Sequence, residues 1–227
     1  LSTGVIANVV GPNQLDDVSA KNGTAGDPDL DTLSGFTTYD AAVLEFDFVP
    51  EGSSVTFRYV FASDEYNEYV HSEFNDVFAF MVNGVNCALI NADPVSINTV
   101  NRGNPFDTDP KENPLYYINN DLDDGGGGIN TEMDGQTVVL SCDAAVNAHV
   151  TNHIKLAIAD ASDHVYDANV FLQQGSFELD CCSGKDCPDD PELSKTCFAD
   201  TPPFYVVVNR TFEDLGRQGS GCQPIIL

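Results

Sequence analysis

The sequence has few positive charges and no long apolar segment. Only 9 residues are Lys or Arg, against 36 that are Asp or Glu, so the formal net charge is −27. A surface of this kind repels the phosphates of nucleic acids and the head groups of anionic membranes. The chain also lacks the run of about 18 apolar residues that a transmembrane helix requires. We therefore expect neither a nucleic-acid partner nor direct insertion into a membrane.

The motifs of several enzyme classes are missing as well. Glu65, Glu68 and Asp160 are candidates for the paired carboxylates of a glycoside hydrolase. Such enzymes usually add aromatic sugar platforms, however, and the chain contains no tryptophan. No GxSxG motif of a serine hydrolase occurs, and the four consecutive glycines lack the lysine of a phosphate-binding loop. We expect a protein without enzymatic activity.

Seven cysteines indicate an oxidising compartment. They form no CxxC pair, which a structural zinc site would typically supply. Cys87 and Cys142 lie in or beside strand-like segments and are candidates for one bridge within a domain, although Cys87 also suits a reduced thiol in the core. The other disulfide candidates are Cys181, Cys182, Cys187, Cys197 and Cys222. An odd number leaves at least one free thiol or one bond to another chain.

Two sequons, at Asn22 and Asn209, are candidate sites of N-glycosylation. Sequons of this kind also arise often by chance. Together with the cysteines and the acidic composition, they favour an extracellular or cell-surface protein.

Short strand-like segments dominate the chain, and helical periodicity is scarce. Apolar residues alternate or run together over strand lengths, with Gly, Asn, Asp and Pro clusters between them, in segments 41–49, 54–62, 76–84, 137–142, 153–160 and 169–179. This pattern predicts an all-β fold, an antiparallel β-sandwich of jelly-roll type with long loops. Segment 3–11 fits either a short helix or a strand.

The composition divides the chain into a domain at 1–180 and a cysteine-rich extension at 181–227. Within the domain, segment 91–134 has few apolar residues and contains four consecutive glycines, which predicts a long surface loop. The extension contains one apolar segment, 202–212, without an obvious partner strand nearby. We expect this strand to pair with the edge of its own sandwich or with another subunit.

Carboxylates gather between pairs of predicted strands. Asp64, Glu65 and Asp76 lie in one such turn, and Asp160, Asp163 and Asp167 lie in another. Oxygen ligands on loops without a basic partner are what Ca²⁺ requires, and a bound cation would offset the mutual repulsion of the carboxylates. We therefore expect these six residues to supply calcium ligands. An acidic, solvated surface is the alternative.

A third acidic set is spaced differently. Asp27, Asp29 and Asp31 resemble the start of an EF-hand loop, but the glycine at the sixth position and the glutamate at the twelfth are missing. The set is a candidate for a second metal site, and a solvated surface explains it equally well.

Four segments carry a family resemblance. GDPDLDTLSGFTTYDAAVLEFDFVP, FRYVFASDEYNEYVHSEFNDVFAFMVNG, VSINTVN and IADASDHVYDANVFLQQGSF resemble, in this order, the choice-of-anchor L domain. The resemblance covers about residues 1–179. It implies an extracellular β-rich module of secreted or surface-anchored, often adhesin-like proteins, without established enzymatic activity. The cysteine-rich extension departs from the family pattern and suggests a specialised assembly.

Two functional hypotheses follow. The first is an extracellular structural or adhesive protein, a calcium-stabilised sandwich that assembles with itself or with other surface proteins through its C-terminal strand, as a filament subunit would. The alternative is a calcium-dependent module that binds a glycan or a peptide. In that case segment 91–134, with Tyr116 and Tyr117, would line the site.

Overall fold

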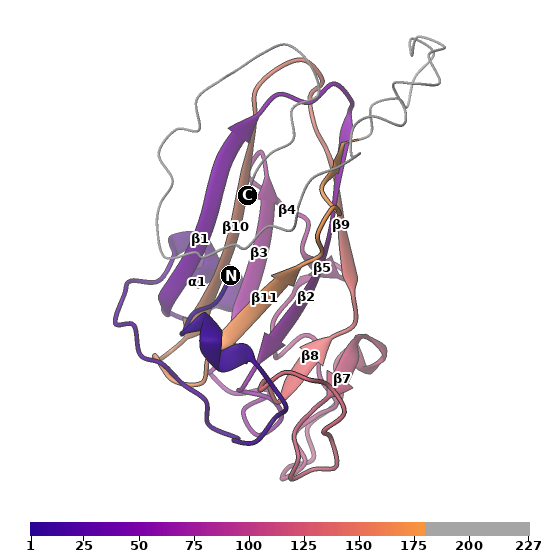
Figure 1. Cartoon of the computed structure of the whole chain (residues 1–227). Coiled ribbons are helices and arrows are strands. Elements are labelled where there is room, and N and C mark those ends of the chain that lie inside the picture. Colours follow the sequence, from indigo (N-terminus) through magenta and orange to yellow (C-terminus); the bar gives the residue numbers. More distant parts are fainter. Residues whose placement is uncertain (180–227) are drawn as a thin grey trace.

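The computed structural model describes residues 1–179, which form two antiparallel sheets packed face to face (Figure 1). The all-β class predicted from the sequence is confirmed. The first sheet has, in spatial order, strands β1 (Thr38–Phe48), β10 (Asn152–Ala161), β3 (Val77–Val82) and β4 (Val85–Asn86).

The second sheet is built around β2 (Ser54–Ser63). The register places two strands on one side of β2, namely β11 (Ala168–Leu172) and β12 (Glu178–Leu179). On the other side lie β8 (Gly135–Thr137) and β9 (Leu140–Ala145), and β8 in turn pairs with β7 (Tyr117–Asn119). A separate small hairpin consists of β5 (Leu89–Ile90) and β6 (Asp93–Pro94).

The hydrophobic core lies between the two sheets. Along β2, alternate residues turn inward, so that Phe57 and Tyr59 are almost fully buried. Their rings contact Phe80 and Phe78 of the opposite sheet, with ring centroids 4.5 and 5.0 Å apart. Edge and tilted contacts of this kind add to the stabilisation from burial alone. The period-two pattern that predicted the strands is thus also the pattern that fills the core.

A disulfide bond between Cys87 and Cys142 connects the two sheets, with their Cα atoms 5.2 Å apart. Cys142 lies in β9, and Cys87 follows β4. This confirms the bridge predicted within the domain. The other five cysteines, Asn209 and the apolar segment 202–212 lie outside the described residues, and the predictions made for them stay predictions.

Removing this bridge should strongly destabilise the domain. We expect the double variant Cys87→Ala/Cys142→Ala to lose about 4 kcal/mol of unfolding free energy, because the bond closes a long loop in the unfolded chain. The measurement is urea denaturation, with Ser141→Ala, an exposed neighbour, as the control. Equal stability of the double variant and the control would contradict the expectation.

The structure corrects the prediction for segment 91–134, which is not a plain surface loop. It contains β6, β7 and a 3-10 helix, η2 (Pro114–Tyr116). Ile97, Val100 and Asn101 are completely buried. Asn101 donates to the carbonyl of Ile97 and accepts from two backbone N–H groups. Buried asparagines therefore supply hydrogen bonds that a sequence poor in apolar residues does not reveal.

Two short helices complete the described part. Residues Ile6–Val9 form a 3-10 helix, η1, which decides between the two structures that segment 3–11 allowed. Helix α1 (Pro28–Ser34) was not predicted, although its signals are present. Asp27 caps it, proline occupies the first turn, and Gly35 ends it with φ of 81°. No helix among residues 1–179 is long and apolar enough to cross a membrane.

Candidate metal centre

Four strand ends meet at one end of the sandwich, the lower end in Figure 1. There β2 and β10 finish, and β3 and β11 begin. The register pairs Ser63 with Ala168 and Val77 with Ala159. The carboxylates beside these positions, which the sequence placed in two separate turns, therefore lie at the same end of the sandwich, near enough for their charges to act on one another.

Five of these carboxylates lie in the interior, and we call them the acidic core: Asp64, Glu65, Asp76, Asp160 and Asp167. Each residue is at most 2% exposed. Asp163, the sixth predicted ligand, is only partly buried, but its charge acts on both Glu65 and Asp76. Within residues 1–179 no ion pair joins any member of the acidic core to a basic side chain. Buried carboxylates without a basic partner are rare in proteins.

Several oxygens of the acidic core have no hydrogen-bond donor within the described residues. Asp76 is the best supplied, because it accepts from the hydroxyl of Ser63 and the backbone N–H of Ala161, both at 3.1 Å. Neither carboxylate oxygen of Asp64 has a hydrogen-bond partner within residues 1–179. The same holds for one carboxylate oxygen in each of three further residues, Glu65, Asp160 and Asp167. The backbone N–H of Asp134 lies near enough to Asp64 to lower its pKa in part, although it forms no hydrogen bond of normal geometry.

Burial and mutual repulsion raise the pKa of these groups. The pKa of Asp64 rises to about 10, first through burial and then through the charges of Asp134 and Asp167. The pKa of Glu65 rises to about 11, through burial and then the charge of Asp76. Burial likewise raises the pKa of Asp76 and Asp160 well above the usual range, and that of Asp167 to about 6. The fold therefore opposes ionisation of these groups unless a positive charge accompanies it.

The N-terminal segment covers the acidic core. Thr3 pairs with Ala168 through its backbone N–H, at 3.0 Å, and the hydroxyl of Thr3 lowers the pKa of Asp160. A side chain at Gly4 would collide with the carboxylate of Asp167, because a Cβ there would lie 1.7 Å from Oδ2. Any larger residue at this position would therefore force the Asp167 carboxylate to move. The same carboxylate accepts from the backbone N–H of Ala20 at 2.9 Å.

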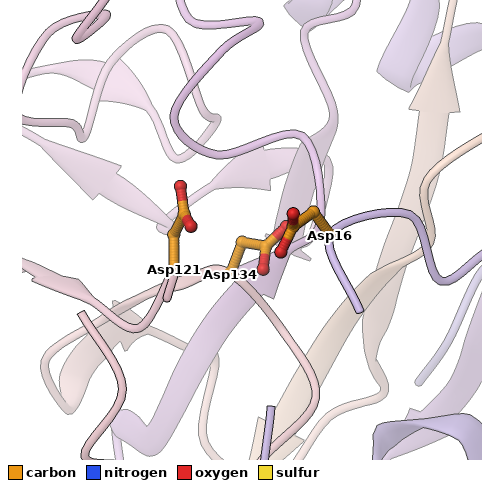
Figure 2. Close-up of side chains that lie close together, drawn as sticks. All are labelled: Asp16, Asp121 and Asp134. Atoms are coloured by element: carbon orange, nitrogen blue, oxygen red, sulfur yellow. The ribbon is translucent and has the colours of Figure 1, made fainter. Parts of the chain in front are cut away.

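A neighbouring set of carboxylates was not predicted from the sequence. Asp16, Asp121 and Asp134, which we call the loop aspartates, each place one carboxylate oxygen within 4.8 Å of the others. Figure 2 shows the carboxylates of Asp16 and Asp134 facing each other, with Asp121 beside them. Burial raises the pKa of Asp134 to about 8. The available signal was an aspartate on each side of the glycine-rich segment 125–128, whose composition by itself predicts only a loop.

The third acidic set has other partners. Asp27 caps α1, and Asp31 accepts from the backbone N–H and the hydroxyl of Thr38, at 2.6 and 2.7 Å. Lys155 bridges Asp27 and Asp29 at 2.7 and 2.6 Å. A basic side chain of the protein therefore already lies at the position considered for a second metal ion. We do not propose a metal there.

Two further candidates are placed by the fold. The side-chain amide of Asn22, an exposed residue, donates to the carbonyl of Thr3 at 2.6 Å, and its glycosylation stays a prediction. Tyr117 is buried, with its hydroxyl 2.5 Å from the side-chain oxygen of Asn67, whereas Tyr116 is exposed. Of the two tyrosines considered for a ligand site, only Tyr116 faces outward.

Comparison with known proteins gives one match. A family model described as the choice-of-anchor L domain matches residues 1–178. No curated protein and no solved structure matches the chain. The matched range includes both sheets, the acidic core and the loop aspartates, so these carboxylates lie within the family domain and not in the C-terminal extension.

Proposed function

The chain belongs to the choice-of-anchor L domain family, which consists of secreted or surface-anchored proteins, and on this basis we propose that it is an extracellular structural or adhesive module stabilised by calcium. In this proposal Ca²⁺ binds in the acidic core. The supporting observation is the group of buried carboxylate oxygens that have no hydrogen-bond partner within the described residues.

Calcium fits these residues better than other common cations. It accepts six to eight oxygen ligands in flexible geometry, and carboxylates from several strand ends can supply them. Zinc would favour nitrogen and sulfur ligands, yet no histidine or cysteine belongs to the acidic core. Magnesium requires near-ideal octahedral geometry and retains several waters, which the burial of all five carboxylates does not favour. Extracellular calcium is abundant enough for binding of moderate affinity.

Neutralising one ligand should separate a metal role from a purely structural one. We expect Asp64→Asn to raise the melting temperature in EDTA, because it removes a carboxyl group that must stay protonated in the folded, metal-free protein but ionises in the unfolded chain. We also expect it to reduce the stabilisation by Ca²⁺ by about half or more. Thermal melts with EDTA and with Ca²⁺ provide the measurement.

The matched control is Glu73→Gln, an exposed carboxylate in the same turn, which should change neither melt. If Asp64 served only as a hydrogen-bond partner, Asp64→Asn would shift both melts equally. That result would contradict the metal role.

Self-association is a further part of the proposal. Among the described residues, β1 is an edge strand with β10 as its neighbour over Ala42–Phe48, so its outer backbone groups are available to another strand. The apolar segment 202–212 of another subunit could add there. We expect the full chain to form concentration-dependent oligomers and Val207→Pro, which removes a backbone donor, to weaken them. Light scattering that shows the same monomer for both proteins would contradict this part.

A second candidate function rests on a groove beside the loop aspartates. The groove measures about 330 Å³ and is lined by Pro12, Asn13, Leu122 and residues 127–130. Amide and apolar groups of this kind suit a sugar or a peptide. A calcium-dependent signal on a glycan or peptide array would favour this function over a purely structural one. Both candidates are non-enzymatic, and turnover of a glycan by the purified protein would contradict them.

A further inference from the structure

We propose that the loop aspartates form a second, separate site for a divalent cation, which fastens the glycine-rich loop to the N-terminal segment. Asp16 is far in sequence from the other two carboxylates, which lie at the two ends of one loop. Asp16 follows η1, Asp121 follows β7, and Asp134 immediately precedes β8. A cation shared by all three would therefore cross-link the N-terminal segment to both ends of the loop 121–134.

The ligand positions are fixed by a hydrogen-bonded framework. Asn120, completely buried, donates to the carbonyls of Thr131 and Met133 and accepts from the backbone N–H groups of Gly128 and Ile129. Both ends of the loop are thus tied to one side chain. A Cβ at Gly126 would lie 2.4 Å from the carbonyl oxygen of Asp121, so glycine is needed for this close approach. The framework holds Asp121 in place without engaging all of its oxygens.

Two buried side-chain oxygens without a hydrogen-bond donor in the described part of the chain independently indicate a ligand. Asp121 is 1% exposed, and while Oδ1 accepts from the backbone N–H of Asp123 at 2.8 Å, Oδ2 has no partner. Asn13 is 5% exposed, and its Oδ1 also has no partner, although its amide nitrogen donates to Asp134 at 2.7 Å. Leaving such buried atoms unpaired is unfavourable for folding. A cation beside Asp134 would satisfy them.

The chemistry indicates a hard cation bound near the surface. The site offers three carboxylates and one amide oxygen, which suits Ca²⁺ with water completing the shell. Asp16 is exposed, so solvent can reach one side of the site. The acidic core, in contrast, is enclosed. The two sites are neighbours, since the charge of Asp134 acts on Asp64, but they share no ligand. This inference therefore does not depend on calcium binding in the acidic core.

The segments joined by the cation already touch. The carbonyl of Val9 accepts from the backbone N–H of Glu132 at 3.1 Å and from the hydroxyl of Thr131 at 3.0 Å, and Val10 forms a bridge with Thr131. Repulsion among the loop aspartates opposes this contact, and a cation would convert the repulsion into attraction. Calcium would thus determine how firmly the loop, and the groove that it borders, is held closed.

Hydrogen exchange of the full chain, with Ca²⁺ as the only added ligand, tests the proposal. We expect Ca²⁺ to slow exchange of the backbone amides of residues 122–131 by about tenfold or more, because opening of the loop requires the cation to dissociate. Asp16→Asn should abolish this protection, and because Asp16 is exposed its replacement should not disturb the fold. Asp121→Asn should do the same while retaining the Oδ1 acceptor.

The matched control is Asp123→Asn, which makes the same charge change on an exposed residue of the same loop. It should retain both full protection and the full rise in melting temperature on addition of Ca²⁺. Asp16→Asn and Asp121→Asn should lose only the part of that rise that the second site contributes, whereas Asp64→Asn should lose part of the rise and keep the protection of residues 122–131. Calcium-independent exchange in the unaltered protein would overturn the inference. Equal loss of protection in Asp16→Asn and Asp123→Asn would also overturn it, because that result would indicate general charge screening.

Discussion

We expect removal of calcium at neutral pH to lower the melting temperature of this protein by roughly 8–16 °C, if free Ca²⁺ exceeds the dissociation constant about a thousandfold. Binding of that strength contributes about 4 kcal/mol to folding, and domains of this size lose about 2–4 °C per kcal/mol. The physical reason is that folding brings together five buried carboxylates, for which no basic partner is found within residues 1–179.

The measurement is a calorimetric melt in EDTA, followed by titration with Ca²⁺ and, separately, with Mg²⁺. Calcium should restore stability at far lower concentration than magnesium, because the oxygen ligands are many and flexibly placed. Equal recovery with both ions, or with monovalent salt at the same ionic strength, would indicate screening of surface charge. The calcium site would then be excluded as the source of stability.

The metal-free protein should lose stability as pH rises from about 5 to about 8, with a slope of up to about 1.4 kcal/mol per pH unit for each proton retained on folding. The sign follows from the raised pKa of Asp64, to about 10, and of Glu65, to about 11. In this pH range the unfolded chain has released both protons, whereas the folded protein keeps them. Raising the pH therefore favours the unfolded state. Below the pKa of the unfolded carboxylates, both states are protonated and this contribution is constant.

Calcium should flatten this pH dependence, because bound carboxylates are ionised in the folded state as they are in the unfolded chain. Binding should also release protons, detectable as acidification of a weakly buffered solution. Urea denaturation across the pH range, with and without Ca²⁺, measures the first effect. Stability that rises with pH in EDTA would show that the carboxylates are ionised and favourably paired in the metal-free protein. That result would contradict the burial argument.

Strands β1 and β2 were predictable because each buries one face, which produces the alternation visible along them. Strands β3 and β10 are buried on both faces over most of their length, and continuous apolar runs predicted them instead. The turns were predictable from Gly, Asn and Asp. Helix α1 was missed because its aspartates suggested a metal-binding loop. In the structure Asp27 instead caps the helix and forms an ion pair with Lys155, which is distant in sequence. A local pattern cannot reveal a partner supplied by another strand. The cross-sheet disulfide between Cys87 and Cys142 was one of the pairings that strand positions allowed.

The candidate site was predictable only in part. That Asp64, Asp76 and Asp160 lie at strand ends follows from the order of apolar segments and acidic turns, but that these ends are neighbours is shown only by the register of the sheets. Their burial does not, because an acidic turn has the same composition whether it lies in solvent or beneath an N-terminal segment. Asp16 and Asp134 were missed for a related reason. They are separated by more than a hundred residues, and only the folded register brings them to one place.

Elemental analysis of the purified full chain, after exhaustive exchange into buffer free of added metal, tests calcium binding most directly. We predict calcium in at least molar equivalence to protein, with no comparable amount of zinc or magnesium. The double variant Asp64→Asn/Glu65→Gln should contain less calcium, while Glu73→Gln should match the unaltered protein. Protein that contains no calcium, and that takes up none on equilibrium dialysis against millimolar Ca²⁺, would show that these carboxylates are buried as protonated acids, and the proposed function would be wrong.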